Sequence, residues 1–365
     1  MLIDYSGVPH GSWARVVIEK QWRDDVEVSF LDDNYTYSLE QIQDDMLVLS
    51  VGSPRTADSA DTSLHLCLPE MFDVKLVAHS LNLRTVNKSH GNFEVNCVEG
   101  VLELDKVRGN EVNLNCGSAD ITVKKLLEGD SSVTCRSFNA KMVNGDKVNI
   151  FCEGDIKVGA MYAKLISAKA VQGSVSLGSV HGNATVEAGL GAVKVGGLDG
   201  SANIVANRGN VSLLVNKLNT SRSTSVRALS GSVEAMVAPT VQTRLLCSQE
   251  NSSSRSSVTI MSSAFQGTSS PQGADGILAG GEAVAVAEGR DLGVGKINIA
   301  AAESQSLQTH LVGVEHSDDK VKHIHDRNMA SLELKASGHI RVETTSWIDS
   351  IRRKYFKDGE GPGAR

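Results

Sequence analysis

Four cysteines have the spacing that most directly suggests chemistry. They are Cys97, Cys116, Cys135 and Cys152, separated by 19, 19 and 17 residues. Thiolates can bind metal ions, form disulfides or act as nucleophiles. The sequence contains no C-x2-C pair, and four thiols in a line do not form the tetrahedron that zinc requires. We therefore interpret these cysteines as buried free thiols, with disulfides between neighbouring repeats as the alternative and no metal site.

A histidine-rich segment is the second candidate for chemistry. It contains His310, His316, His323 and His325, accompanied by Asp318, Asp319 and Asp326. On an extended strand His323 and His325 would face the same side, and paired imidazoles are common zinc ligands. Histidines in a polar loop are also often only solvated. Metal binding through the His310–His325 segment is therefore an alternative function, and we predict no bound cofactor.

The acidic residues and the nucleophiles give no enzyme signature. Asp120, Asp130 and Asp155 lie near expected turns, but no spacing pairs them for acid–base chemistry. The chain lacks a G-x-S-x-G elbow and a Walker-type phosphate loop, and Cys67 and Cys247 have no identifiable base partner. We predict no enzymatic activity. A carbohydrate-binding or carbohydrate-acting β-helix protein is the alternative.

Short glycine-punctuated repeats must position all of these residues. Glycine recurs every nine residues, at Gly173, Gly182, Gly191, Gly200 and Gly209. In the five units that begin there, the third and fifth positions are apolar and the fourth is polar. Because side chains alternate across a strand, each unit predicts a short strand that buries two residues and exposes the one between them. Glycine would supply a turn conformation that other residues resist.

Two such units, about 18 residues, would form one coil of a β-solenoid that buries its apolar face against the next coil. The cysteine spacing indicates the same period independently. The G-x-apolar-x-apolar unit also occurs at Gly100, Gly154, Gly231, Gly295 and Gly338. We predict an all-β, single-stranded parallel β-solenoid, right-handed by the general rule for parallel crossovers.

Composition changes along the chain divide it into five predicted segments. They are an irregular β cap at 1–90, the regular solenoid at 91–247, a Ser/Gly/Ala-rich flexible insertion at 248–290, returning solenoid strands at 291–346, and a helix and tail at 347–365. The helix is predicted from Ser346 as its N-cap and from apolar residues at helical spacing.

The net charge of -7 argues against a broad surface for nucleic acid or anionic membrane. No apolar run approaches the length of a membrane span. The start of the chain lacks a basic region followed by an apolar run, so we expect no signal peptide. We predict an intracellular, cytoplasmic protein, with a mitochondrial location as the alternative if a longer N-terminus exists.

The run from Phe93 to Val237, with its Gly-x-Val-x-Val strands, resembles the putative-adhesin β-solenoid domain, a domain of unknown function found in many bacterial proteins. The whole chain, with its inserted loop and the Gly338 strand running into Ser346-Trp347, resembles the animal family called family with sequence similarity one hundred and eighty-five. These resemblances imply a β-solenoid and no activity, because neither family has functional residues to carry over. The sequence predicts a non-enzymatic structural or protein-interaction protein with unknown protein partners.

Overall fold

The computed structural model describes residues 71–219 and 221–238 in full, together with separate strands before and after them. Those strands are β1 (Leu2–Asp4), β2 (Trp13–Gln21), β3 (Glu27–Phe30), β4 (Tyr35–Gln43), β5 (Met46–Pro54), β6 (Asp61–Pro69), β16 (Thr243–Gln249), β17 (Ser257–Gln266), β18 (Ala283–Ala287), β19 (Gly293–Ala300), β20 (Thr309–Leu311), β21 (Ala330–Ala336) and β22 (Ile340–Thr344). The chain divides into two compact units, Met1–Asn183 and Ala184–Arg365.

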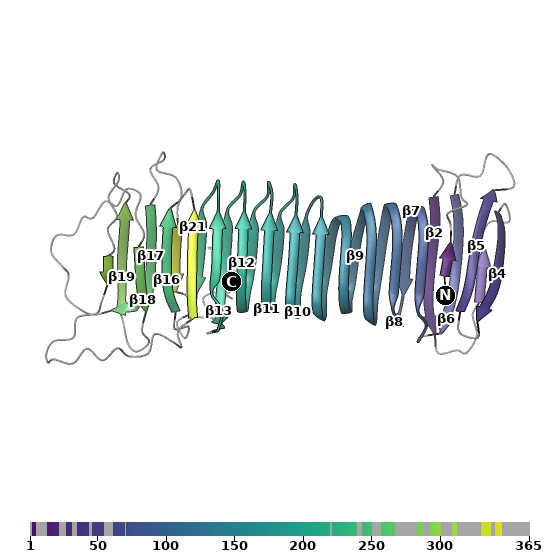
Figure 1. Cartoon of the computed structure of the whole chain (residues 1–365), viewed down its shortest axis with the longest axis horizontal. Helices are drawn as coiled ribbons and strands as arrows, with labels where there is room; N and C mark the ends of the chain where they lie inside the picture. The colour runs from purple at the N-terminus through teal and green to yellow at the C-terminus, as the bar shows by residue number, and fades with distance from the viewer. Residues whose placement is uncertain are drawn as a thin grey trace, which may run out of the picture. The chain divides into compact units, whose positions relative to one another are not determined.

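The first unit is a stack of parallel β coils, which confirms the predicted fold (Figure 1). Its coils are formed by β7 (Val74–Val86), β8 (Lys88–His90), β9 (Phe93–Cys152), β10 (Ile156–Ala170) and the first part of β11 (Val175–Ala188). Val74 lies opposite Phe93, nineteen residues later, and Phe138 lies opposite Ile156, eighteen residues later. The observed period therefore matches the predicted coil of about 18 residues.

The second unit contains the same kind of parallel ladder. Its coils are formed by β12 (Val193–Ala206), β13 (Val211–Leu218), β14 (Thr224–Ala228) and β15 (Val233–Val237). Val193 lies opposite Val211, eighteen residues later, whereas Asn203 lies opposite Ser225, twenty-two residues later. The longer coil reflects extra residues in the connection between β13 and β14.

The predicted strand register is confirmed by burial. The third and fifth positions of all five nine-residue units are buried, from Val175 and Leu177 to Val211 and Leu213. None of the fourth positions is buried. The cysteines of the ladder are also buried, each with at most 8% of its surface exposed. Inward side chains thus form continuous apolar columns through each stack, and outward side chains remain available for contacts at the surface.

The first two strands of the chain, β1 and β2, and the last two, β21 and β22, each lie between two other strands. In the first unit β1 pairs with β5 on one side and β7 on the other, and β2 pairs with β6 and β7. In the second unit β21 pairs between β14 and β16, and β22 pairs between β15 and β17. Each unit also has two antiparallel strands that pair with its outer coil strands. In the first unit β3 pairs with β6 and β4 with β5, and in the second β18 pairs with β16 and β19 with β17. They cover sheet edges that would otherwise present unpaired backbone groups.

Several predicted segments differ in detail or lie outside the described residues. The parallel ladder begins before residue 91, and β17 and β18 lie within the segment predicted as a flexible insertion. Gly295 lies in β19, which pairs antiparallel with β17, whereas the Gly338 repeat leads into β22, which is parallel to β15. The predicted helix at 347–365 and His316, His323 and His325 lie outside the described residues. No helix in the described part of the chain is long and apolar enough to span a membrane.

Candidate functional site

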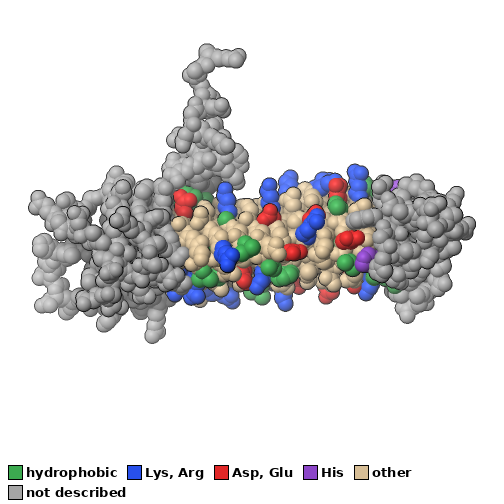
Figure 2. Space-filling model, turned by 90° about the horizontal axis from the view of Figure 1, so that it is seen from above, with side chains coloured by type: hydrophobic (Ala, Val, Ile, Leu, Met, Phe, Trp, Pro, Cys, Tyr) green, Lys and Arg blue, Asp and Glu red, His purple; other side chains and the backbone are tan. Residues whose placement is uncertain are grey.

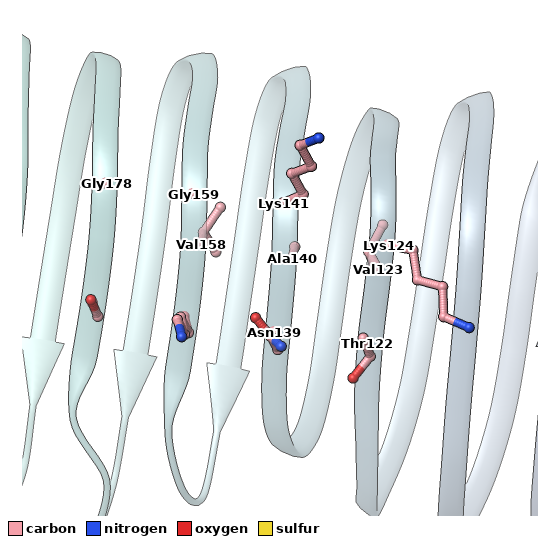
Figure 3. Close-up of a pocket in the computed structure, with 11 residues that line it drawn as sticks. Thr122, Val123, Lys124, Asn139, Ala140, Lys141, Val158, Gly159 and Gly178 are labelled. Carbon is pink, nitrogen blue, oxygen red and sulfur yellow. The ribbon is translucent and has the colours of Figure 1, made fainter. Parts of the chain in front are cut away.

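A shallow trough crosses four successive coils on the outside of the first unit (Figure 3). Its volume is about 400 Å³. Its walls are formed by Thr122, Val123, Lys124, Asn139, Ala140, Lys141, Lys157, Val158, Gly159, Ser176 and Gly178. These residues belong to β9, β10 and β11, so the trough runs across the strands and along the stacking direction of the coils.

Strand alternation explains which side chains line the trough. Val123, Ala140 and Val158 point into the core and are at most 3% exposed. The residues on either side of each therefore point outward. Pairing of β10 with β9 places Lys157 opposite Asn139, so the outward residues of successive coils form two adjacent columns. The repeat pattern predicts Ser176 at the surface but indicates no site here.

Two glycines keep one end of the trough free of side chains. A Cβ atom on Gly159 would lie 2.5 Å from the Lys141 carbonyl oxygen, and one on Gly178 would lie 2.2 Å from the Gly159 carbonyl oxygen. Contacts that short with backbone atoms are sterically forbidden, so the close approach of the coils requires glycine at both positions. The trough is consequently open above this stretch of backbone.

The trough is basic although the chain as a whole is acidic. Its lining contains three lysines and no carboxylate. The Lys124 ammonium forms an ion pair with the Glu103 carboxylate at 2.7 Å. Lys141 and Lys157 are exposed, and within the described ranges neither forms an ion pair. Two cationic groups on adjacent coils therefore lack a local counter-charge.

Elsewhere in this unit many basic side chains bond to a carboxylate on a neighbouring coil. These pairs are Lys75–Glu94 at 3.0 Å, Lys125–Asp105 at 2.9 Å, Lys164–Asp146 at 2.7 Å and Arg108–Glu128 at 2.5 Å. The hydrogen bond from Lys75 lowers the pKa of Glu94, and that from Lys124 lowers the pKa of Glu103. Figure 2 shows charges of both signs distributed over the described surface.

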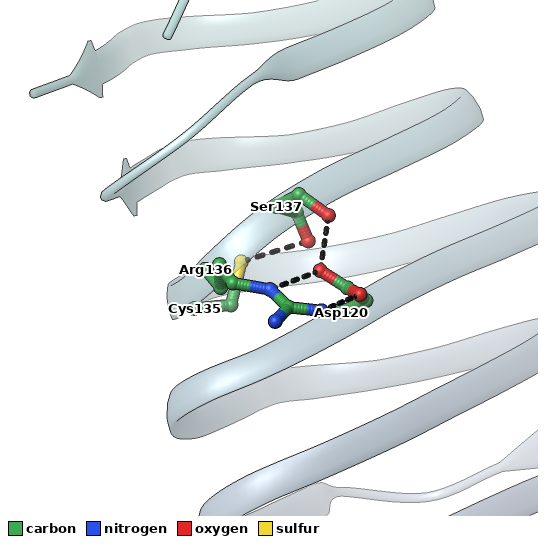
Figure 4. Close-up of polar contacts among 4 residues, drawn as sticks. All are labelled: Asp120, Cys135, Arg136 and Ser137. Carbon is green, nitrogen blue, oxygen red and sulfur yellow. Dashed lines mark hydrogen bonds and ion pairs between the residues drawn. The ribbon is translucent and has the colours of Figure 1, made fainter. Parts of the chain in front are cut away.

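Asp120, the first of the acidic residues considered for catalysis, lies in a polar cluster at a coil turn (Figure 4). Its carboxylate accepts hydrogen bonds from Arg136 Nε at 2.9 Å, from Arg136 Nη2 and from Ser137 Oγ at 2.6 Å. The hydrogen bonds between the two side chains lower the pKa of Asp120 below its ordinary value. The same bonds raise the pKa of Arg136. The carboxylate therefore stays ionised and joins two coils, as expected of a structural residue.

We expect the Asp120→Asn substitution to lower the free energy of unfolding by about 1 kcal/mol at neutral pH, because this half-exposed ion pair is screened by water. Since the pKa of Asp120 is lowered on folding, its contribution is present above the unfolded-state pKa of about 3.9 and is lost as the pH falls through the folded-state value. Urea unfolding at several pH values measures the difference. The Arg136→Gln substitution should remove the same pH-dependent part of the unfolding free energy. If the wild type and Asp120→Asn still differed in unfolding free energy at acid pH, this account would be contradicted.

The other two acidic candidates also bond to the following coil. Asp130 Oδ1 accepts hydrogen bonds from the backbone N–H groups of Asp146 at 3.1 Å and Lys147 at 3.0 Å. Asp155 Oδ1 accepts one from the Ser174 N–H at 2.7 Å. These carboxylates satisfy backbone donors at the turns, where the sheet ladder is interrupted. The structure does not bring Asp120, Asp130 and Asp155 together.

The cysteine ladder consists of free thiols in the core, as the spacing predicted. The Cys135 and Cys152 sulfur atoms lie 3.3 Å apart on adjacent coils. A hydrogen bond with Cys97, followed by burial, raises the pKa of Cys116, and the corresponding bond with Cys152 raises the pKa of Cys135. Because the thiolate is the reactive form, the Cys116 and Cys135 thiols are poor nucleophiles and poor metal ligands at neutral pH. Cys67 is likewise buried and is not part of a disulfide, and the Cys247 side chain lies outside the described residues.

Among the described side chains, no three histidine, cysteine or acidic groups are arranged to hold a metal ion. His310 lies in β20, and its side chain is outside the described set.

The lysine trough could not be found from the sequence alone, because the trough depends on the register between coils. The available signal was the outward position of Lys124, Lys141 and Lys157 in three successive repeats.

Comparison with known proteins assigns no family. No protein-family model matches the chain, and no curated protein matches it. One solved structure, described as a "putative cell adhesion protein" from Clostridium sporogenes, aligns over 94% of this chain and 96% of its own length. The alignment has 8% sequence identity and a TM-score of 0.16, which is too low to relate the two folds.

Proposed function

We propose that the protein is a non-enzymatic structural or interaction protein that uses the outer surface of its coils for binding. The observation that carries this proposal is the trough, where Lys141 and Lys157 lack the carboxylate partners that many other basic side chains of the unit have. Single exposed lysines without an ion pair, such as Lys147, occur elsewhere in the described part of this unit, but Lys141 and Lys157 lie together in one trough that contains no carboxylate. A binding partner of opposite charge can contact both of them there.

The contacts between coils support this assignment. Asp120, Asp130 and Asp155 are engaged in bonds between coils, and the thiols of the ladder are buried, with raised pKa values at Cys116 and Cys135. These aspartates and cysteines, which suggested chemistry in the sequence, therefore maintain the solenoid. Solenoids commonly bind partners through extended regular surfaces. On the repeat pattern we also propose kinship with the putative-adhesin domain and with the animal family named above.

Proximity labelling in cells of the source organism tests the proposed function. The full-length wild type should label a reproducible set of partners, and the charge-reversing double substitution Lys141→Glu with Lys157→Glu should lose that set. The matched control is the double substitution Lys147→Glu with Lys169→Glu, which reverses the charge of two lysines that are exposed in the same unit and do not line the trough. An unchanged set with the trough variant, at equal melting temperature, would show that the trough is not the binding surface.

A further inference from the structure

The chemistry of the trough also indicates the kind of molecule that it binds, an inference that rests on the proposed function. We propose that the trough binds a linear acidic polysaccharide, whose carboxylate groups contact the lysines and whose hydroxyl groups contact the neutral polar side chains. The polysaccharide lies along the stacking direction of the coils.

The direction and length of the trough favour an extended ligand. The trough crosses four coils, and neighbouring strands in a sheet are about 4.8 Å apart, so its length is roughly 14 Å. It is shallow and open, and the core residues beneath it are covered by their own backbone. A compact ligand would require an enclosed pocket that surrounds it. A flat chain of several linked sugars matches the trough better.

The positions of the cations favour a ligand that carries several negative charges. Lys141 lies in one of the two outward columns, and Lys157 lies on the next coil in the other column, level with Asn139. Glu103 already neutralises Lys124, so Lys141 and Lys157 provide the uncompensated charge. A repeating anion with one carboxylate per sugar can contact both without distorting the coils. Lysine contributes here as a point charge and requires no fixed geometry from the carboxylate.

The neutral lining distinguishes a sugar chain from an acidic peptide. Thr122, Asn139 and Ser176 supply hydroxyl and amide groups that can donate to and accept from sugar hydroxyls. An extended peptide binds to a sheet chiefly by pairing its backbone with an exposed edge. In the trough the β10 backbone already pairs with β9, Lys157 with Asn139 and Val158 with Ala140, so a peptide lying across these strands would find no free sheet edge there. A polyhydroxylated anion uses the side chains that are present.

Isothermal titration calorimetry with the full chain tests the inference, using polygalacturonate oligomers as the probe. A neutral galactan of equal length and polyglutamate are the comparison ligands. We expect polygalacturonate to bind, with an affinity that falls as salt is added. The double substitution Lys141→Gln with Lys157→Gln should weaken binding by at least about tenfold. The matched substitution Lys147→Gln with Lys169→Gln should leave the affinity unchanged.

Three results would overturn the inference. They are no binding of polygalacturonate, equal binding of the neutral galactan, and binding of polyglutamate that is equally tight and equally sensitive to the trough substitutions. The last result would identify an acidic polypeptide as the occupant. Loss of labelled partners in the Lys141→Glu, Lys157→Glu variant without any polysaccharide binding would refute this inference alone and leave the proposed function standing.

Discussion

Replacement of Val195 by aspartate is expected to lower the free energy of unfolding by about 4 kcal/mol at pH 7. Val195 is 3% exposed and lies opposite Leu213, which is fully buried in the next coil. A carboxylate in this position has no charged partner, so the introduced group must remain protonated. Keeping it protonated at pH 7, against an ordinary pKa of about 3.9, costs about 1.4 kcal/mol per pH unit, or roughly 4 kcal/mol in total.

This destabilisation should depend on pH in a defined direction. Because burial raises the folded-state pKa of the introduced carboxyl, the pH-dependent part of the penalty disappears below about pH 4 and grows as the pH rises, whereas the cost of burying the neutral polar group stays at every pH. Urea unfolding followed by far-UV circular dichroism at several pH values measures both the size and the slope. The matched substitution Lys194→Asp changes the neighbouring residue, which is exposed, and should cost less than about 0.5 kcal/mol. Equal losses for the two variants would mean that the strand register is wrong.

The sequence was sufficient to predict the coil and its register. A strict nine-residue period with apolar third and fifth positions permits only one face of each strand to be buried. The cysteine spacing reported the same coil length, and the structure places all four of those cysteines inside the stack. Both signals are local, because each depends only on residues within one or two repeats.

The order of the coils could not be predicted in the same way. The insertion of β1 and β2 between neighbouring coils, and of β21 and β22 in the other unit, depends on which of several similar strands pair. The repeats have nearly equivalent apolar patterns, so the pattern of one strand does not identify its neighbour. The trough was missed for the same reason, since it exists only when outward residues of four coils are aligned.

The glycines show a further limit of sequence reasoning. The repeat predicts turn conformations for them, and Gly182 and Gly200 do have positive φ angles, of 129° and 147°. Gly173 and Gly209 do not show this conformation. At these two positions an added Cβ would lie within 2.2 Å of backbone atoms in the preceding coil, so close packing between coils requires glycine. A glycine repeat in the sequence therefore records two different physical constraints.

Gly182 combines both constraints, and we expect Gly182→Ala to be among the most destabilising single substitutions in the first unit. Its φ of 129° is a conformation that residues with a side chain rarely adopt, and the added Cβ would lie 1.7 Å from the Ala163 carbonyl oxygen. Backbone strain costs about 1 to 3 kcal/mol and overpacking about the same, so the free energy of unfolding should fall by roughly 2 to 6 kcal/mol.

The matched control is Gly154→Ala, in the same unit, where φ is not positive and the added Cβ would lie 3.1 Å from the Arg136 carbonyl oxygen. A small shift of the backbone can relieve that contact, so we expect a loss of about 1 kcal/mol. Urea unfolding of both variants, followed by far-UV circular dichroism, gives the comparison. Equal stability of the two variants would contradict the coil-to-coil contact at Gly182, because the steric penalty there follows directly from the eighteen- or nineteen-residue register of this unit.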